Sequence, residues 1–194
     1  MKKILYLGVK KKKIIDFFFK KKIDFDYFKT IHEDEIDDKK YKLIISYRYK
    51  KIFSNYTLIK FKKKIINCHL SFLPWNRGSN PNFWSFFYDT PKGVTIHYVD
   101  SKIDTGEIIA KKYLNFKITK KSTLKSTYKI LDYNLQNLLI SNIEKIINGH
   151  VVSFKQDKTG TYYNELDFKP FKKFLKNGWD TKINIIENKG YEFF

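Results

Sequence analysis

The sequence is poor in several residue types whose abundance marks common classes of protein. A single cysteine, Cys68, excludes an internal disulfide framework and leaves no cysteine-based zinc site. The first apolar stretch, residues 4–9, ends at Lys10 and is too short for a signal peptide. No run approaches the roughly 18 apolar residues that a membrane helix needs. We therefore predict a cytoplasmic protein that does not insert into a membrane.

Proline and glycine are also scarce, at four and eight residues, and no Pro/Gly/Ser-rich linker divides the chain. The 194 residues, 42% of them hydrophobic, are enough for one domain with a full core. We therefore expect a single domain over residues 1–194, in which residues from about 150 to 194 form a small C-terminal hairpin and a tail.

Acidic residues are few, with 20 Asp and Glu against 39 Lys and Arg, so the formal net charge is +19. Such a charge would attract nucleic acid, acidic lipid or anionic metabolites. Heavy use of Lys, Ile, Asn, Phe and Tyr throughout is, however, typical of an AT-rich genome, and we interpret the lysine runs as solvated faces. A basic nucleic-acid-binding module without catalysis remains an alternative. It requires aromatic residues interleaved with lysines on one exposed face, whereas the aromatic residues here fall largely at core spacing.

Hydrophobic periodicity predicts strands that alternate with helices. The early strands are nearly continuous in apolar residues, which is typical of a mainly parallel α/β sheet. The predicted strands are residues 4–9, 41–46 and 64–70, a strand pair at 93–99 and 107–116, and a terminal hairpin from 151–154 and 161–163. The predicted helices are residues 14–19 and 81–88 and a long helix that begins after Ser122 or Thr123 and ends at Gly149.

Three polar residues stand where the predicted topology would bring them together. If residues 64–69 form a strand, Asn67 and His69 share one face and Cys68 points to the other. The excursion from His69 to the Asp-Thr-Gly turn at 104–106 is long enough to return Asp104 to the same strand end, where open parallel sheets bind their ligands. A lone strand histidine is usually structural, so the joint pattern carries the prediction.

That joint pattern resembles the 10-formyltetrahydrofolate-dependent formyltransferase family. Its parts are Asn-x-His at 67–69, Ser-x-Leu-Pro-x-x-x-Gly at 71–78, Gly-Val-Thr-Ile at 93–96 and Val-Asp-x-x-Ile-Asp-Thr-Gly-x-Ile-Ile at 99–109. The resemblance is strong over residues 41–112. It implies a Rossmann-like, mainly parallel sheet with helices on both faces, and a single formyltransferase catalytic domain.

The resemblance also implies the site residues and the formyl donor, 10-formyltetrahydrofolate, with no metal. Asn67 would stabilise the oxyanion formed when an amine attacks a formyl group, and His69 would accept the amine proton. Asp104 would fix the orientation of His69 and increase its basicity. The pterin pocket would be formed mainly by backbone groups of two loops, at Lys51, Ile52 and Phe53 and at Val99, Asp100, Ile103 and Asp104.

Two departures from the family are visible. Leu70 follows the histidine where the family usually has proline, and only 66 residues precede Asn67, fewer than is usual. The N-terminal part is therefore expected to be shortened, and part of the usual acceptor pocket to be missing. His97 is interpreted as a surface or core residue. An aspartic-protease reading of the turn at 104–106 would require a second such carboxylate from a partner chain, and we set it aside.

The acceptor is inferred by comparing the branches of the family. The tRNA enzymes carry a C-terminal barrel, the hydrolases an N-terminal regulatory domain, and the ribonucleotide enzymes a glycine-rich phosphate loop; residues 7–12 offer one glycine and a lysine run. We predict a sugar N-formyltransferase that acts on a dTDP- or UDP-linked 4-amino-dideoxyhexose for surface glycans such as lipopolysaccharide. Trp75, Asn76 and Arg77 are the nearest candidates to bind this substrate. The alternatives are a glycinamide ribonucleotide or other small-amine formyltransferase and an inactive relative, and a homodimer is left open.

Overall fold

The computed structural model describes residues 2–157, 159–187 and 189–190. Its strands are β1 Lys3–Gly8, β2 Phe25–Phe28, β3 Tyr41–Tyr47, β4 Ile65–His69, β5 Arg77–Gly78, β6 Gly93–Tyr98, β7 Ile108–Tyr113 and β8 Tyr162–Tyr163. Its α-helices are α1 Lys12–Lys20, α2 Asn55–Lys60, α3 Pro81–Phe87, α4 Leu124–Ile147 and α5 Ile183–Ile186. Short 3₁₀ helices lie at η1 Glu33–Glu35, η2 Lys169–Phe174 and η3 Gly178–Asp180.

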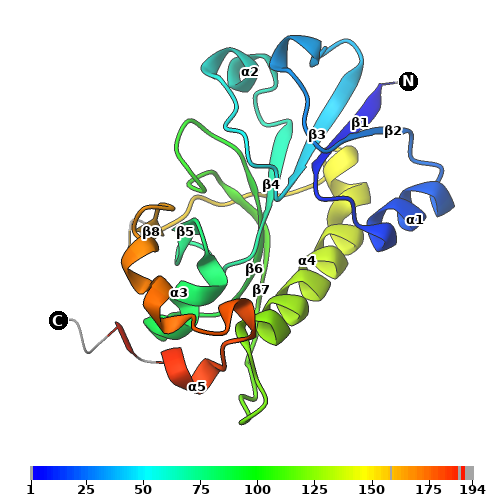
Figure 1. The fold of residues 1–194 in the computed structure, drawn as a ribbon. Helices are drawn as coiled ribbons and strands as arrows, with labels where there is room; N and C mark the ends of the chain where they lie inside the picture. The colour runs from blue at the N-terminus through cyan, green and yellow to red at the C-terminus, as the bar shows by residue number, and fades with distance from the viewer. Residues whose placement is uncertain (1, 158, 188, 191–194) are drawn as a thin grey trace.

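Six strands form one sheet in the order β2-β1-β3-β4-β6-β7 (Figure 1). The pairs β1–β2, β1–β3 and β3–β4 are parallel, and the pairs β4–β6 and β6–β7 are antiparallel. The sheet is thus parallel in its N-terminal two thirds and ends in the predicted strand pair. The mixed, mainly parallel α/β fold expected from the sequence is confirmed.

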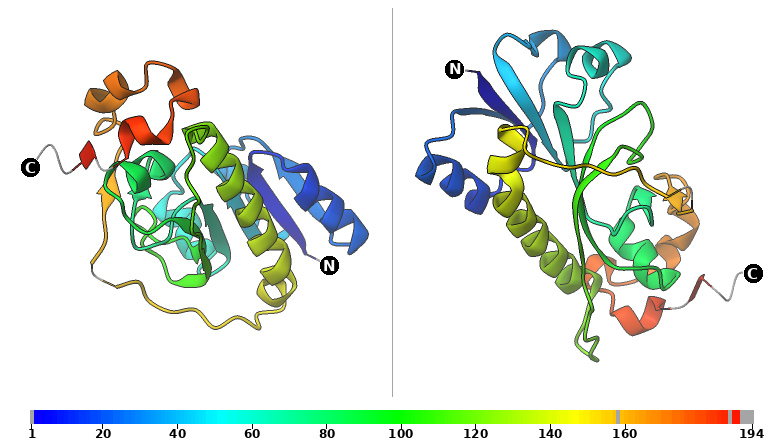
Figure 2. Two further views of the ribbon diagram at one scale, coloured as in Figure 1. Left: turned by 90° about the horizontal axis from the view of Figure 1, so that it is seen from below. Right: turned by 180° about the vertical axis from the view of Figure 1, so that it is seen from behind.

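The near-continuous apolar strands bury both of their faces, because successive side chains point to opposite sides of a sheet. In β1, Ile4 and Tyr6 belong to one core and Leu5 and Leu7 to another. The first core lies under the long helix α4, which runs beside α1 in both views of Figure 2. The second core is closed by the segment from Ile31 to Ile36 and by Phe53 and Phe61 around α2. Helices therefore cover both faces, as predicted.

Helix α4 forms because its sequence supplies both a cap and an apolar stripe. Thr123 accepts a hydrogen bond from the backbone N–H of Ser126, and the Ser126 hydroxyl accepts one from the N–H of Thr123, which closes a capping box. Leu131, Leu135 and Leu139 follow at helical spacing and are fully buried or nearly so. The predicted stripe is therefore core. Among the described residues no helix is long and apolar enough to cross a membrane.

The predicted C-terminal hairpin is wrong. Residues 151–154 and 161–163 do not pair with each other in the described part of the chain. Phe154 instead forms an antiparallel bridge to Ile108 at the start of β7, and β8 pairs in parallel with β5. The following segment (orange to red in Figure 1) packs its Phe168 and Ile183 on α3. Residues 191–194 of the predicted tail lie outside the described residues.

Candidate active site

Strand β4 carries Asn67 and His69 on the sheet face opposite Ile66 and Cys68, as alternation requires. The register places Asn67 between Ser46 of β3 and His97 of β6. The Ser46 hydroxyl donates to Asn67 Oδ1 at 2.9 Å, which leaves the amide Nδ2 facing the other way. The sheet thus fixes the orientation of the Asn67 amide before any ligand binds.

The turn after β6 returns Asp104 to this strand end. Asp104 adopts a left-handed backbone conformation with φ of 54°, and its Oδ1 accepts a hydrogen bond from Asn67 Nδ2 at 3.0 Å. Its Oδ2 lies 3.6 Å from Nδ1 of His69. The structure therefore brings the three predicted catalytic side chains together.

Two glycines allow the close approaches that hold Asp104 in place. A Cβ on Gly106 would lie 1.8 Å from the carbonyl oxygen of Tyr98, so only glycine lets the turn fold onto the end of β6. Gly78 has φ of 87°, and its N–H donates to Asp104 Oδ2 at 2.8 Å. The β5–β8 pairing positions this N–H, because a Cβ on Gly78 would lie 2.2 Å from the Tyr163 carbonyl oxygen.

The Asp104 carboxyl is almost enclosed, with 10% of its side chain exposed. Burial by itself raises the pKa of this carboxyl, but the neighbouring His69 and His97 and the N–H of Gly78 outweigh burial and hold the pKa well below its usual range. Asp104 is therefore a carboxylate throughout the neutral range, and it can stabilise a positive charge that appears on a neighbouring ring.

Backbone carbonyls fix the proton positions on both histidines, since a carbonyl can only accept a hydrogen bond. His69 Nε2 lies 3.0 Å from the carbonyl oxygen of Asn76, so Nε2 carries a proton and Nδ1 is the nitrogen free to accept one. His97 Nδ1 lies 2.7 Å from the carbonyl oxygen of Tyr98, so its Nε2 faces the site. That Nε2 is 3.3 Å from both Asn67 Nδ2 and Asp104 Oδ1.

His97 is thus a site residue that the sequence interpretation missed. It was placed at the surface or in the core, and its side chain is indeed only 2% exposed. Its contacts, however, are with Asn67 and Asp104. The available signal was strand alternation: Val94 and Ile96 are core residues, so Thr95 and His97 must face the other side, where Asn67 lies.

The three residues predicted to bind the acceptor do not line the cavity described below. Asn76 is fully buried, and its side-chain amide donates to the Thr90 hydroxyl at 2.7 Å. Arg77 directs its guanidinium to Gln156 at 2.8 and 3.0 Å, and Trp75 is half-buried. A direct contact between Asn76 and a ligand is excluded by this burial. Asn76 instead supplies the carbonyl that orients His69.

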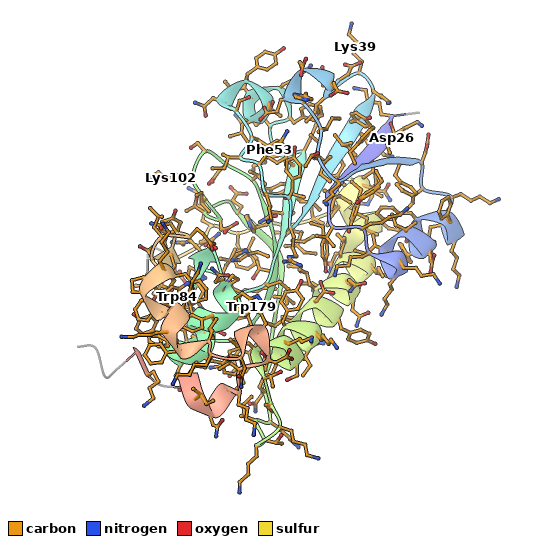
Figure 3. The ribbon with its side chains drawn as sticks, viewed as in Figure 1. Asp26, Lys39, Phe53, Trp84, Lys102 and Trp179 are labelled. Atoms are coloured by element: carbon orange, nitrogen blue, oxygen red, sulfur yellow. The ribbon has the colours of Figure 1, made fainter. Side chains whose placement is uncertain are left out.

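A cavity of about 1420 Å³ opens over Asn67, His69, His97 and Asp104. It exceeds the ~300–1,000 Å³ of a typical small-molecule site and has room for two ligands. The residues predicted for the pterin pocket all line it, namely Lys51, Ile52, Phe53, Val99, Asp100, Ile103 and Asp104. Figure 3 places Phe53 and Lys102 toward one end of the molecule and Trp179, which also lines the cavity, well below them. The cavity therefore extends away from the predicted pterin loops toward η3.

The fold and this site define a one-carbon transferase class, and a family model described as formyl transferase matches residues 10–143. The chain belongs to this family, as its sequence motifs predicted. It is 31% identical to the bifunctional polymyxin resistance protein ArnA of Wigglesworthia glossinidia brevipalpis, over 96% of this chain and 28% of that protein. It is 33% identical to the methionyl-tRNA formyltransferase of Fusobacterium nucleatum, over 72% of this chain and 44% of that protein. The chain thus spans less than half the length of these relatives.

Among solved structures, the formyltransferase PseJ from Anoxybacillus kamchatkensis is similar over nearly its whole length. It is 35% identical with a TM-score of 0.90, covering 97% of this chain and 99% of that one. It was solved with UDP-4,6-dideoxy-4-formamido-L-AltNAc and tetrahydrofolate. The N-formyltransferase of Helicobacter canadensis, solved with folinic acid and dTDP-3-aminofucose, shares the fold at a TM-score of 0.78 and 22% identity, over 97% of this chain and 81% of that one.

Proposed function

We propose that this protein transfers a formyl group from 10-formyltetrahydrofolate to the amine of a nucleotide-linked amino-deoxy sugar. The observation that carries the proposal is the cluster of Asn67, His69 and Asp104 in a cavity large enough for two ligands. The full-length likeness to PseJ supports the class of acceptor. We also propose that residues 1–194 act as one catalytic unit.

The donor would occupy the part of the cavity formed by the loops at 51–53 and 99–104. Ile52 and Ile103 line the cavity and yet are 77% and 41% exposed. Exposed aliphatic side chains in a concave site are suited to contact the faces of a folate's rings, while backbone groups of the same loops can bind their polar edges. When bound, the donor supplies the formyl group, and the role of these loops is to hold it with that group toward β4.

Asn67 and His69 would then act on the reacting atoms. Ser46 and Asp104 fix the plane of the Asn67 amide. Its other N–H, which lies toward His97 Nε2 at 3.3 Å, would be shared with the formyl oxygen and stabilise negative charge there. His69 Nδ1 accepts the proton that the attacking amine loses, because Nε2 is committed to Asn76. Asp104 Oδ2, 3.6 Å from that nitrogen, would stabilise the resulting imidazolium. The imidazolium can return the proton to the leaving nitrogen of tetrahydrofolate as the bond between that nitrogen and the formyl carbon breaks.

The acceptor would occupy the part of the cavity next to α4 and η3. Polar and aromatic side chains gather there, which suits a ligand that carries both a sugar and a nucleobase. They are Arg48, Tyr128, Tyr162, Trp179 and Asp180. A glycinamide ribonucleotide acceptor is the competing proposal, and it remains to be separated by experiment.

The experiment is formyl transfer in vitro, followed by mass spectrometry. The purified protein is incubated with 10-formyltetrahydrofolate and a panel of dTDP- and UDP-linked 4-amino-deoxyhexoses, with glycinamide ribonucleotide as competitor. We expect one of the sugars to gain the mass of one CO unit. The control is His69→Asn, which should lower turnover by roughly a hundredfold or more while 5-formyltetrahydrofolate still binds. Formylation of the ribonucleotide alone would reject the sugar acceptor, and no formylation at all would favour an inactive relative.

The setting of the reaction is also part of this proposal. A nucleotide-linked amino sugar is an intermediate in the assembly of surface glycans, and we place its formylation in the cytoplasm, where a free thiol such as Cys68 stays reduced. A homodimer remains a prediction, and size-exclusion chromatography with light scattering would test it.

A further inference from the structure

The cavity contains one guanidinium with no carboxylate partner. Arg48 is the first residue after β3 and lines the cavity. Its Nη1 donates to the Tyr128 hydroxyl at 2.6 Å, and the guanidinium carbon lies 5.1 Å from the centre of the Tyr128 ring. None of the ion pairs in the described part of the chain includes Arg48. By contrast, Lys125, on the same wall, is paired with Asp180 at 3.3 Å.

The backbone conformation of Arg48 directs its side chain toward α4. Its φ of 54° lies in the left-handed region, which a residue with a long side chain seldom adopts. The residue before it, Tyr47, is buried in the α4-side core and donates to Asp132 Oδ1 at 3.0 Å. The change of conformation at Arg48 therefore lets two consecutive side chains, Tyr47 and Arg48, both reach toward α4.

The position of Arg48 separates it from the loops assigned to the donor. The β3–β4 register ends with Tyr47 opposite Cys68, so Arg48 begins the turn at the end of β3. From there Arg48 turns to α4, whereas Lys51 Nζ donates to the Ile31 carbonyl and Phe53 joins the core around α2. After β3, the side chain of Arg48 thus points to α4, and those of Lys51 and Phe53 point to the core around α2. Arg48 therefore lies on the side of the sheet that we assign to the acceptor.

We propose that Arg48 binds the diphosphate group of the acceptor, a deduction that rests on the proposed function. A guanidinium has five N–H donors in a planar fork, and Tyr128 uses one of those of Arg48. The remaining donors match the oxygens of a phosphate, and such charge-assisted pairs are among the stronger hydrogen bonds of proteins. Because Tyr128 already holds the side chain, little further rotamer freedom is lost on binding. The diphosphate would also supply a negative charge next to Arg48, which has no carboxylate partner among the described residues.

Direct binding tests the assignment without relying on catalysis. Isothermal titration calorimetry with UDP and dTDP as probes is compared with uridine and with 5-formyltetrahydrofolate. Arg48→Gln should weaken binding of the diphosphates by roughly 10- to 100-fold and leave uridine and the folate unchanged. Arg48→Lys keeps the charge but loses the planar fork, so it should fall between Gln and the wild type. Tyr128→Phe keeps the ring and removes the hydroxyl, and should produce a smaller loss.

The matched control is Lys42→Gln, which removes one positive charge from the opposite end of the same strand, at an exposed position. It should bind all four probes as the wild type does. Three results would overturn the proposal: unchanged diphosphate binding in Arg48→Gln, an equal loss for uridine, or no diphosphate binding to the wild type. Weaker folate binding in Arg48→Gln would assign the residue to the anionic tail of the donor instead. If diphosphates bind through Arg48 but no sugar is formylated, the proposed function fails and this assignment stands.

Discussion

Asp26 and Asp104 are two carboxylates whose pKa values are both lowered, but by different neighbours: mainly lysines for Asp26 and histidines for Asp104. Asp26 lies on β2 at the edge of the sheet, and Figure 3 shows it on the opposite side of the molecule from Lys102. It accepts from Lys40 at 2.7 Å, from Tyr41 at 2.8 Å and from Lys3 at 3.2 Å. Asp104 lies in the cavity with two histidines, an amide and one backbone N–H for neighbours.

The difference lies in which neighbour can change its charge. Lysines stay protonated throughout the neutral range, so the charges of Asp26 and its lysine partners do not change there, and we interpret this cluster as stabilising the fold. Histidine is the side chain that gains and loses a proton near neutral pH. A carboxylate next to histidines can therefore respond when one of them gains a proton. A lowered carboxyl pKa thus accompanies a lysine cluster in one region and the candidate active site in the other.

Of the two carboxylates, we expect Asp104 to matter far more for turnover, and Asp104→Asn should have the largest effect. It removes the negative charge that stabilises a protonated His69, so we expect kcat to fall by roughly 10²–10⁴-fold. Steady-state formyl transfer measures the change, and circular dichroism checks the fold. Asp26→Asn is the matched control, because it neutralises another carboxylate whose pKa is lowered, and it should leave kcat within about twofold. Wild-type turnover in Asp104→Asn would remove Asp104 from the mechanism.

His97 tests whether the reactive site needs both histidines. His97→Leu removes the contacts with Asn67 and Asp104, and the loss of hydrogen bonds worth about 1.5 kcal/mol should lower kcat about tenfold. His97→Gln keeps a side-chain donor that cannot titrate, so it should retain more activity than Leu. If Gln and Leu variants are equally impaired, proton exchange at His97 matters more than its hydrogen bonds. If both match the wild type, His97 only fills space.

A substitution at Thr161 tests whether the Asn76 carbonyl, which orients His69, affects turnover. The Thr161 hydroxyl accepts from the Asn76 backbone N–H at 2.8 Å and lies 3.3 Å from its side-chain oxygen. Thr161→Val should loosen Asn76 and lower kcat about fivefold, for a hydrogen bond worth about 1 kcal/mol. The Kd of 5-formyltetrahydrofolate should stay unchanged, and Thr161→Ser should restore kcat. A loss in Thr161→Ser that Thr161→Val does not share would indicate a packing role for the methyl group.

Asp26→Asn should produce the smallest effect, and it acts on stability. Hydrogen bonding to Lys40, Tyr41 and Lys3 lowers the pKa of Asp26 to about 2 against the opposing effect of burial. A depressed carboxyl pKa stabilises the fold above the unfolded value near 4 and loses that contribution as pH falls toward about 2. Its lysine partners are 35% and 48% exposed, so we expect at most about 1 kcal/mol at pH 7. Urea unfolding at pH 7 and pH 3 measures it: the gap between wild type and variant should narrow in acid.

Much of the fold was readable from the sequence because its strands are long and apolar. The predicted strands at 4–9, 41–46 and 64–70 correspond to β1, β3 and β4, and the long helix begins at its predicted cap. Strand β2 was missed, since four residues between lysine-rich segments give too short a pattern. Strands β5 and β8 have two residues each, and no periodicity exists at that length. Strands β5 and β8 are far apart in the sequence, so their pairing depends on the folded chain. A hairpin between the neighbouring segments 151–154 and 161–163 was predicted instead, because sequence patterns indicate only local pairing.

The candidate site divides in the same way. Asn67, His69 and Asp104 were predicted because strand alternation and the turn at 104–106 are local features, and because the motifs that contain them resemble the formyltransferase family. His97 depends on the antiparallel register between β4 and β6, which only the folded sheet sets. Asn76 shows the opposite error: it is close to the site in sequence, but its side chain points into the protein.

The pairing of β5 with β8 gives this protein a property that concerns its synthesis. Asn67, His69 and Asp104 all emerge from the ribosome well before Tyr162 and Tyr163, which position the Gly78 N–H on Asp104. Domains begin to fold from their N-terminal part while translation continues. A chain interrupted before Thr161 would contain the three candidate catalytic side chains and still lack the β5–β8 pairing that positions the Gly78 N–H against Asp104. The site would thus be completed only late in translation, and we expect incomplete chains not to consume the formyl donor.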